Sequence, residues 1–256
     1  MRSDSIINWK NLGKNDPYYG VLSEEKYKME RLSPEIVNEF FKTGESFVSD
    51  TGRRIQKLFD VNIKDLSILD FGCGVGRLAI PFAKASEKQV CGIDVSPDII
   101  DRAIDHQRAL EVKNLIFKTY DGSNLADIGM FDCINSYIVF QHIEPANGMA
   151  LLSQLLQKLR VGGIMQVQLT HGHRLPPLTY LNFYLRTKFY PYNLIYSSLK
   201  NRKWGAEATM QMNHYNTKAL FNLFSEYTDQ VHVEFTDHGG HLGAFYLFRK
   251  NKERHG

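Results

Sequence analysis

The feature that most constrains the fold is a regular alternation of short apolar runs with helical patterns between residues 66 and 170. Five apolar runs are predicted to be strands, at 66–71, 89–95, 115–120, within 131–140 and at 164–170. Apolar residues at helical spacing between them predict helices at 77–84, 98–110 and 147–160. Strands that alternate with helices form βαβ crossovers. The pattern therefore predicts an α/β fold with a mostly parallel sheet and helices on both faces.

Two segments fall outside this alternation. Residues 1–60 are predicted to be a mostly helical extension, in which Ser33 caps a long helix and Pro34 takes its first position. Residues 171–215 are rich in aromatic residues and carry six Lys or Arg against one Glu. Ordinary connections have about 2–6 residues, so we interpret this segment as an inserted cap. The predicted organisation is a helical lid at 1–60 and one domain at 61–256 that contains the cap.

The chain returns to regular structure after residue 215. A helix is expected with Asn216 or Thr217 as its cap. Residues 230–235 and 243–250 are predicted to form a closing pair of strands. Only the turn-rich segment 236–242 joins them, so the pair is expected to be antiparallel.

Composition narrows the function classes. The chain has 256 residues, of which 43% are hydrophobic, and a formal net charge of +3. That length suits one large α/β domain or two small ones, and the balanced charge does not favour wrapping nucleic acid. The start does not resemble a secretory signal, and no run approaches the roughly 18 apolar residues that cross a bilayer. Cys73, Cys91 and Cys133 lie in or beside apolar strands, which favours buried thiols and a cytoplasmic location.

The first strand leads into a glycine-rich turn that reads ILDFGCGVGRL. Gly72, Gly74 and Gly76 follow Asp70 in a GxGxG pattern, where a ligand can approach the backbone closely. A dinucleotide fingerprint would need GxGxxG. A P-loop would need Gly-Lys-Ser/Thr where Arg77 now stands.

Acidic residues end the next two strands. Asp94 closes the second strand, 22 positions after Gly72, where an acid can accept both hydroxyls of a ribose. Asp121 ends the third strand and could receive an exocyclic amine. The alternative is that Asp121, which precedes Gly122, is an ordinary turn residue, and that Asp70 only caps the glycine turn.

Five motifs occur in order over residues 66–170: LDFGCGVGR, GIDVS, YDGSNL, FDCINSYIVFQHI and LRVGGIMQVQ. Together they resemble the class I S-adenosylmethionine (SAM)-dependent methyltransferases. The resemblance implies a Rossmann-like sheet of seven strands with the last one antiparallel. It also implies SAM as cofactor and S-adenosylhomocysteine (SAH) as product.

The resemblance also assigns roles to residues of the turn and strand ends. Asp70 or a carbonyl near Gly72 would hold the ammonium of the cofactor, and the turn amides or Arg77 its carboxylate. Arg77 could equally be a surface residue. The full set of expected cofactor-binding residues is Asp70, Gly72, Cys73, Gly74, Arg77, Asp94, Val95, Asp121, Gly122, Ser123, Ser136 and Tyr137.

Catalysis is expected at the end of the fourth strand, in SYIVFQHIE. Methyl transfer is an in-line displacement, and an oxygen nucleophile also needs a proton acceptor. His142 is the first candidate base, with Glu144 and His171 as further catalytic candidates; the alternative for His142 is a hydrogen bond to a loop carbonyl. His171, His173 and His214 match no familiar metal spacing, so no metal is expected.

The acceptor can be narrowed by comparison with other methylases. The motifs of nucleic-acid amino-group methylases, cytosine-ring methylases and protein arginine methylases are missing from the fourth strand. We therefore predict a small-molecule acceptor, methylated at oxygen in preference to nitrogen, with a free or carrier-linked sugar hydroxyl as an example. The alternatives are an inactive SAM-binding scaffold or regulator, and an N-methyltransferase that acts on a small amine.

The basic, aromatic cap leaves three interpretations open. It could attract an anionic substrate through Arg174, Arg186, Lys188, Arg202 and Lys203. It could contact a membrane surface through residues 178–199, or its aromatic residues could form a small core of their own, which is the interpretation that we favour. In the extension, Trp9, Tyr18 and Tyr19 are expected to close over the cofactor, or else to pack against a second subunit.

Overall fold

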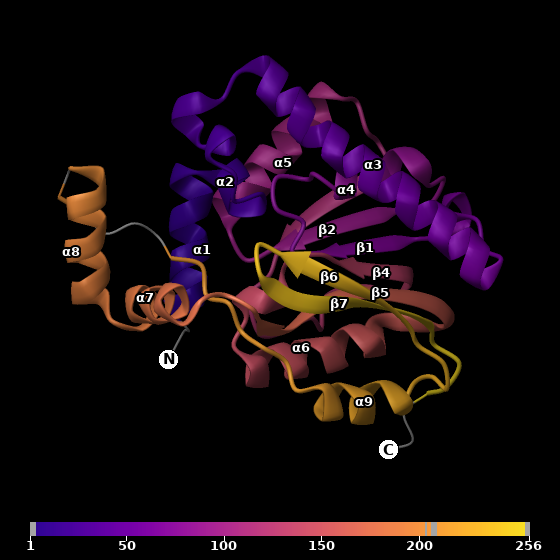
Figure 1. The fold of residues 1–256 in the computed structure, drawn as a ribbon. Coiled ribbons are helices and arrows are strands. Elements are labelled where there is room, and N and C mark those ends of the chain that lie inside the picture. Colours follow the sequence, from indigo (N-terminus) through magenta and orange to yellow (C-terminus); the bar gives the residue numbers. More distant parts are fainter. Residues whose placement is uncertain (1–3, 203, 206–208, 254–256) are drawn as a thin grey trace.

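The computed structural model describes residues 4–202, 204–205 and 209–253. Its centre is a seven-stranded sheet with the strand order β3-β2-β1-β4-β5-β7-β6 (Figure 1). The strands are β1 (Ile68–Phe71), β2 (Val90–Asp94), β3 (Leu115–Thr119), β4 (Phe131–Ser136), β5 (Leu159–His173), β6 (His232–His238) and β7 (His241–Arg249). The chain crosses over after β3, so the carboxyl ends of β1 and β4 lie side by side at the switch point, where α/β sheets bind ligands.

The pairing directions confirm the predicted fold class. Strands β1 to β5 pair in parallel, and β7 runs antiparallel to both β5 and β6. The connection between β6 and β7 is shorter than the expected 236–242, because only Gly239 and Gly240 separate the strands. Both glycines have positive φ, at 63° and 88°, as a two-residue hairpin turn requires.

Helices cover both faces of the sheet (Figure 1). On one face lie α3 (Pro34–Phe59), α4 (Ala79–Ala85) and α5 (Pro97–Ala109), and on the other lie α6 (Pro145–Lys158) and α9 (Thr217–Ser225). The predicted caps form: Ser33 Oγ accepts a hydrogen bond from the Ile36 amide at 3.4 Å, and Asn216 Oδ1 accepts one from the Ala219 amide at 3.0 Å.

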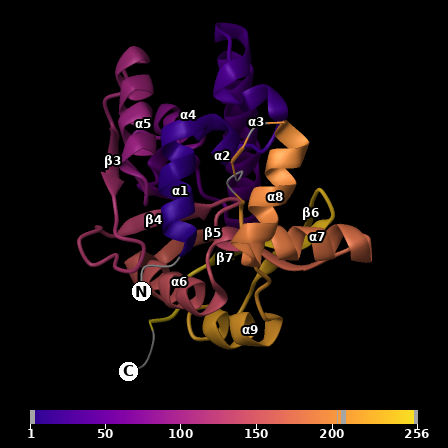
Figure 2. The same cartoon turned by 90° about the vertical axis from the view of Figure 1, so that its left-hand side faces the viewer.

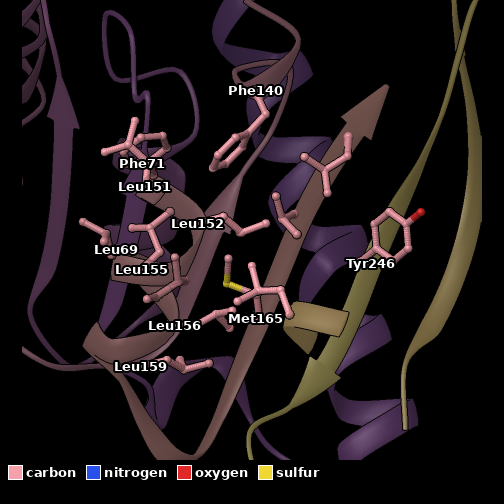
Figure 3. Close-up of a cluster of buried hydrophobic side chains, with 14 of the residues drawn as sticks. Leu69, Phe71, Phe140, Leu151, Leu152, Leu155, Leu156, Leu159, Met165 and Tyr246 are labelled. Carbon is pink, nitrogen blue, oxygen red and sulfur yellow. The ribbon is translucent and has the colours of Figure 1, made fainter. Parts of the chain in front are cut away.

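The larger core lies between the sheet and α6. Leu151, Leu152, Leu155 and Leu156 of α6 are all buried, and Figure 3 shows this cluster packed against strand residues such as Met165. Residues of β1 alternate between the two cores, because successive side chains of a strand point to opposite faces. The three cysteines are buried and free, as expected.

The boundary between α6 and β5 differs from the prediction. The helix was expected at 147–160 and the strand at 164–170, with Val161–Gly163 as a break. The helix instead begins at Pro145, and β5 follows it directly from Leu159. The two glycines are accommodated inside the strand, where the register with β4 shifts between Phe131 and Cys133. A strand can absorb extra residues as a bulge, which the apolar pattern does not reveal.

The remaining helices frame one end of the sheet. The amino-terminal segment forms α1 (Asp4–Asn15), α2 (Pro17–Val21), η1 (Glu25–Tyr27) and η2 (Met29–Arg31), and η3 (Ile63–Asp65) follows α3. After β5 come α7 (Pro177–Lys188) and α8 (Tyr190–Asn201), and η4 (Phe140–His142) follows β4. Figure 2 shows α1, α7 and α8 at the same side of the molecule. Among the helices that the structure describes, none is long and apolar enough to cross a membrane.

Candidate active site

The glycine turn between β1 and α4 adopts a conformation that favours glycine. Gly72, Gly74 and Gly76 have φ angles of 74°, 55° and 87°. A Cβ at Gly72 would lie 2.4 Å from Val139 Cγ2, and one at Gly74 would lie 2.4 Å from Val21 Cγ2. A side chain at either position would therefore have to displace Val139 or Val21, which line the cavity described below.

Asp94 ties this turn to the end of β2. Its Oδ2 accepts a hydrogen bond from the Gly74 amide and its Oδ1 one from the Ser96 amide, each at 3.1 Å. Burial raises the pKa of Asp94, while these amide bonds favour the ionised form. A carboxylate offers about four lone-pair sites, so Asp94 keeps acceptor capacity for a ribose hydroxyl.

A cavity of about 510 Å³ opens at this edge of the sheet. Nine of the predicted site residues line it: Gly72, Gly74, Asp94, Val95, Asp121, Gly122, Ser123, Tyr137 and His142. They come from the ends of β1, β2, β3 and β4, which the parallel sheet brings to one edge. Asp121 Oδ1 also accepts bonds from the Ser123 and Asn124 amides at 2.8 and 2.9 Å, so it shapes the loop as well as lining the cavity.

Several lining residues were not predicted. Ile6, Tyr120 and Ile138 face the cavity, together with Ile99 of α5. Ile138 has a φ of 59°, a costly conformation for a β-branched residue that persists only where its surroundings enforce it. It lies two positions after β4, inside the SYIVFQHIE run where catalysis was expected. Trp9, which was expected to close over the cofactor, lines the same cavity, and its ring centroid is 5.0 Å from that of His142.

Four expected cofactor-binding residues lie outside the lining. Asp70 is buried below the turn, its Oδ1 accepts a bond from Asn135 Nδ2 at 2.8 Å, and burial raises its pKa to about 6. Ser136 Oγ donates to the Phe71 carbonyl at 3.2 Å. The Cys73 thiol packs toward Gly92, in the interior.

Arg77 is the fourth. Its side chain is buried, donates from Nη1 to Thr43 Oγ1 at 3.3 Å and lies over the Tyr137 ring at 5.7 Å. Gly44 lets α3 approach the Arg77 backbone closely, since a Cβ there would be 2.0 Å from the Arg77 carbonyl oxygen. The guanidinium is therefore directed to α3 and is not among the groups that line the cavity.

His142 lies at the end of η4 and is almost fully buried. Its Nδ1 is 2.7 Å from the Gln211 carbonyl oxygen, which can only accept, so Nδ1 carries the proton. Its Nε2 accepts a 3.2 Å bond from Gln141 Nε2, and the Gln141 amide is oriented by Thr170 Oγ1, which donates to Oε1 at 3.1 Å. Burial lowers the pKa of His142 to about 4, so the ring is neutral at pH 7.

The other two catalytic candidates occupy structural positions. Glu144 is exposed and caps α6 by accepting a bond from the Asn147 amide at 3.2 Å. His171 uses both ring nitrogens, with Nδ1 2.8 Å from the Tyr215 carbonyl oxygen and Nε2 2.7 Å from the Tyr246 hydroxyl. Neither lines a cavity at this edge of the sheet. Within the described part of the chain, no group of three or more His, Cys, Asp or Glu could hold a metal ion.

A second cavity of about 960 Å³ adjoins the first. The two share four lining residues: Gly20, Val21, Ile138 and His142. Charged groups of both signs line the second cavity: Asp16, Glu24, Glu25, Lys28, Arg186, Lys200 and Asp237. Of the cap cations predicted to attract an anion, Arg186 lines it, whereas Arg174, Lys188 and Arg202 do not, and Lys203 lies outside the described residues.

The first cavity fits SAM on three observations. The glycine turn presents backbone without side chains, Asp94 keeps acceptor capacity at the end of β2, and apolar residues such as Val95 and Ile99 form a wall beside Asp121. The turn suits the amino-acid end of SAM, Asp94 suits its ribose, and the apolar wall suits its purine.

Comparison with known proteins agrees with this geometry. A family model described as a methyltransferase domain matches residues 68–163. Residues 68–163 therefore match a methyltransferase domain, in agreement with the motifs.

Curated relatives match a similar share of the chain. The ribosomal protein L11 methyltransferase of Porphyromonas gingivalis is 31% identical over 103 residues, which is 40% of this chain and 34% of that protein. The protein of the same name from Burkholderia multivorans is 32% identical over 97 residues, covering 38% and 29% of the two chains. The chain spans about a third of the length of these relatives.

Solved structures share the fold over nearly the whole chain. Magnesium protoporphyrin IX methyltransferase from Synechocystis PCC 6803 with bound SAM has a TM-score of 0.61 at 16% identity, and covers 96% of this chain and 97% of that one. The same protein with bound SAH has a TM-score of 0.57 at 18% identity, with 96% and 94% covered.

The glycine turn yields a first testable prediction. In Gly74→Ala, the new Cβ would lie against Val21, which lines the cavity, and Gly74 has a φ of 55°. We therefore expect SAH affinity to fall by about tenfold or more in a calorimetric titration.

Gly162→Ala is the matched control, because Gly162 also has a positive φ, of 83°, but a Cβ there meets nothing within 4 Å. Backbone strain should cost each variant about 1 kcal/mol of stability, and the clash with Val21 should cost Gly74→Ala more. Only Gly74→Ala should lose SAH affinity. Equal SAH affinity in the two variants would contradict this role for the turn.

Proposed function

We propose that this chain transfers a methyl group from SAM to a hydroxyl oxygen of a small polar molecule held in the second cavity. The observation that carries the proposal is the position of His142, which lines both cavities and presents Nε2 as a hydrogen-bond acceptor. An acceptor hydroxyl in the second cavity and a methyl donor in the first would meet beside this ring.

The cofactor would supply an electrophilic methyl on a sulfonium, and the chain would bind and orient both partners. The turn at Gly72 and Gly74 would hold the amino-acid end, Asp94 the ribose and Asp121 with Ser123 the adenine side. Because the reaction is an in-line displacement, such positioning supplies a large part of the rate enhancement.

His142 would accept the proton of the attacking hydroxyl. Its Nδ1–H is fixed by the Gln211 carbonyl, which leaves the lone pair on Nε2. That lone pair now accepts the 3.2 Å bond from Gln141, which also lines the second cavity. A bound hydroxyl would take the place of the Gln141 amide, so the base would be exposed only when an acceptor arrives.

We further propose that the helices at this end close the site. Ile6 and Trp9 of α1 and Val21 of α2 line the first cavity, as expected for a lid. Phe183 and Arg186 of α7 and Lys200 of α8 line the second cavity, as expected for a substrate cap. Water would thereby be kept from the reacting atoms.

The mixed charge of the second cavity supports a polar acceptor. Carboxylates such as Asp16 and Glu25 can accept bonds from sugar hydroxyls, and Lys28 and Arg186 can donate to oxygen or phosphate. A free or carrier-linked sugar fits this lining. Ribosomal protein L11 appears in the names of the curated relatives, but those relatives match only 40% and 38% of this chain.

Calorimetric titration with SAM and with SAH tests the proposal. We expect micromolar binding of both, followed by methyl transfer to sugar or phenol acceptors. Binding without transfer to any hydroxyl acceptor, together with transfer to a small amine, would favour an N-methyltransferase. Binding without any transfer would favour a scaffold, and no binding by folded protein would overturn the proposal.

A further inference from the structure

Helix α8 has its polar and apolar faces reversed. Asn193 and Ser197 are buried, at 4% and 0% exposure, whereas Ile195 and Leu199 are 56% and 76% exposed. Residues two positions apart on a helix point to nearly opposite sides, so the buried face is polar and the exposed face apolar. The buried pair is satisfied locally, because Asn193 Oδ1 accepts bonds from Ser197 Oγ and Arg186 Nε, both at 3.1 Å.

Helix α7 extends the exposed apolar surface. Leu178, Leu181 and Tyr184 are each about half exposed or more, and Tyr190 at the start of α8 is 67% exposed. A helix that packs in a globular protein usually turns its apolar stripe inward. We call residues 177–201 the α7–α8 hairpin, and its exposed face is of a kind that soluble monomers rarely show.

The charge of this region has one sign. Residues 174–205 contain no Asp or Glu, and their cations include Arg186, Lys188, Lys200 and Arg202. Lys188 and Arg202 are exposed beside the apolar residues. Leu, Ile and Tyr side chains in a segment whose only charged residues are cations are typical of segments that bind the surface of anionic membranes.

The hairpin is placed where it could reach such a surface. Figure 1 shows α8 as the outermost element on its side of the molecule, standing off from the sheet, and Figure 2 looks onto that side. The opposite side of the same hairpin contributes Phe183, Arg186 and Lys200 to the second cavity. A membrane bound here would lie close to that cavity.

We propose that the α7–α8 hairpin docks this protein on an anionic lipid bilayer. The apolar stripe would enter the headgroup region, and Lys188 and Arg202 would contact lipid phosphates. A second copy of the chain is a poorer occupant, because a symmetric contact would bring the cations of two hairpins together with no acid to pair them. If the proposed methyl transfer is correct, which this extension assumes, the acceptor would be a lipid-borne polar group.

Flotation with lipid vesicles tests the docking. We expect the protein to float with vesicles of phosphatidylcholine and phosphatidylglycerol at three to one, and to bind at least about tenfold more weakly to phosphatidylcholine alone or in 0.5 M salt. The double variant Ile195→Glu/Leu199→Glu should reduce binding to the anionic vesicles by about tenfold or more, since it places two acids at the interface.

The control variant is Phe221→Glu/Phe235→Glu, which makes the same charge change at side chains that are 72% and 94% exposed on α9 and β6. It should float like the wild type. SAH titration verifies that each variant is folded and separates the two proposals, since it does not depend on lipid. Equal flotation of the two double variants, or no flotation of wild-type protein that binds SAH, would overturn the docking. The docking would also be overturned if light scattering showed that the wild type is a dimer and that Ile195→Glu/Leu199→Glu dissociates it. The hairpin would then contact a second copy of the chain instead of a membrane.

Discussion

Replacing His142 by Gln is expected to lower kcat by about 10²–10⁴-fold, the usual range for loss of a positioned proton acceptor. The physical reason is that Nε2 is the acceptor atom between the two cavities, and a Gln amide cannot take a proton at neutral pH. SAH affinity should change by less than about tenfold, since the residues that would hold the cofactor stay in place. Single-turnover kinetics with a saturating acceptor measures the effect.

His171→Gln is the matched control. His171 is also partly buried and bonded through both ring nitrogens, but it lines neither cavity. We expect a loss of thermal stability with kcat retained. If His171→Gln lowered kcat as strongly as His142→Gln at a temperature where both are folded, the assignment of the base would be wrong.

The pH profile of the wild type gives an independent check on His142. Burial depresses its pKa from 6.5 to about 4, so the basic form persists as the pH falls through 6.5. The acid limb of kcat/KM should therefore lie near pH 4 to 5 rather than at the usual histidine value. Circular dichroism over the same range separates loss of catalysis from acid unfolding.

Replacing Asp94 by Ala is expected to weaken SAH binding by about 3 kcal/mol, which is roughly 150-fold. The loss combines the acceptors for two ribose hydroxyls with the bond that holds the Gly74 amide in the glycine turn. Calorimetric titration measures it. Asp98→Ala is the control, because Asp98 is exposed in the first turn of α5 and outside the cavity.

Asp94→Ala also separates an enzyme from a scaffold. Turnover should fall together with cofactor affinity if the chain is a methyltransferase, whereas a scaffold would keep its partner. Unchanged SAH affinity in Asp94→Ala would mean that Asp121 and Ser123 hold the nucleoside alone, or that SAH binds elsewhere.

Local sequence patterns determined much of the fold. Short apolar runs became β1 to β5 within a few residues, with β5 as the exception, because its glycines were absorbed as a bulge instead of ending the strand. Helix caps such as Ser33 and Asn216 could be predicted from the sequence because each side chain accepts a hydrogen bond from an amide only three residues away. The position of Asp94 and Asp121 at the candidate site could be predicted because parallel strands bring their carboxyl ends to one edge of the sheet.

Other features depend on contacts between segments far apart in the chain. Arg77 follows the glycine turn, but its guanidinium donates to Thr43 of α3 and lies over the Tyr137 ring. Glu144 and His171 carry the right chemistry for catalysis, yet one caps a helix and the other joins Tyr215 to Tyr246. A residue type states what a side chain can do, and its neighbours decide whether it faces a ligand.

The sequence by itself determined the α/β class, the order of the motifs and the acids at the strand ends, because periodicity and capping are local properties. Only the tertiary structure decided that Trp9 packs beside His142, that His142 lines two cavities, and that α8 turns its apolar face outward. The physical reason is that burial and hydrogen-bond partners are assigned by packing, and packing joins residues that the linear chain keeps far apart.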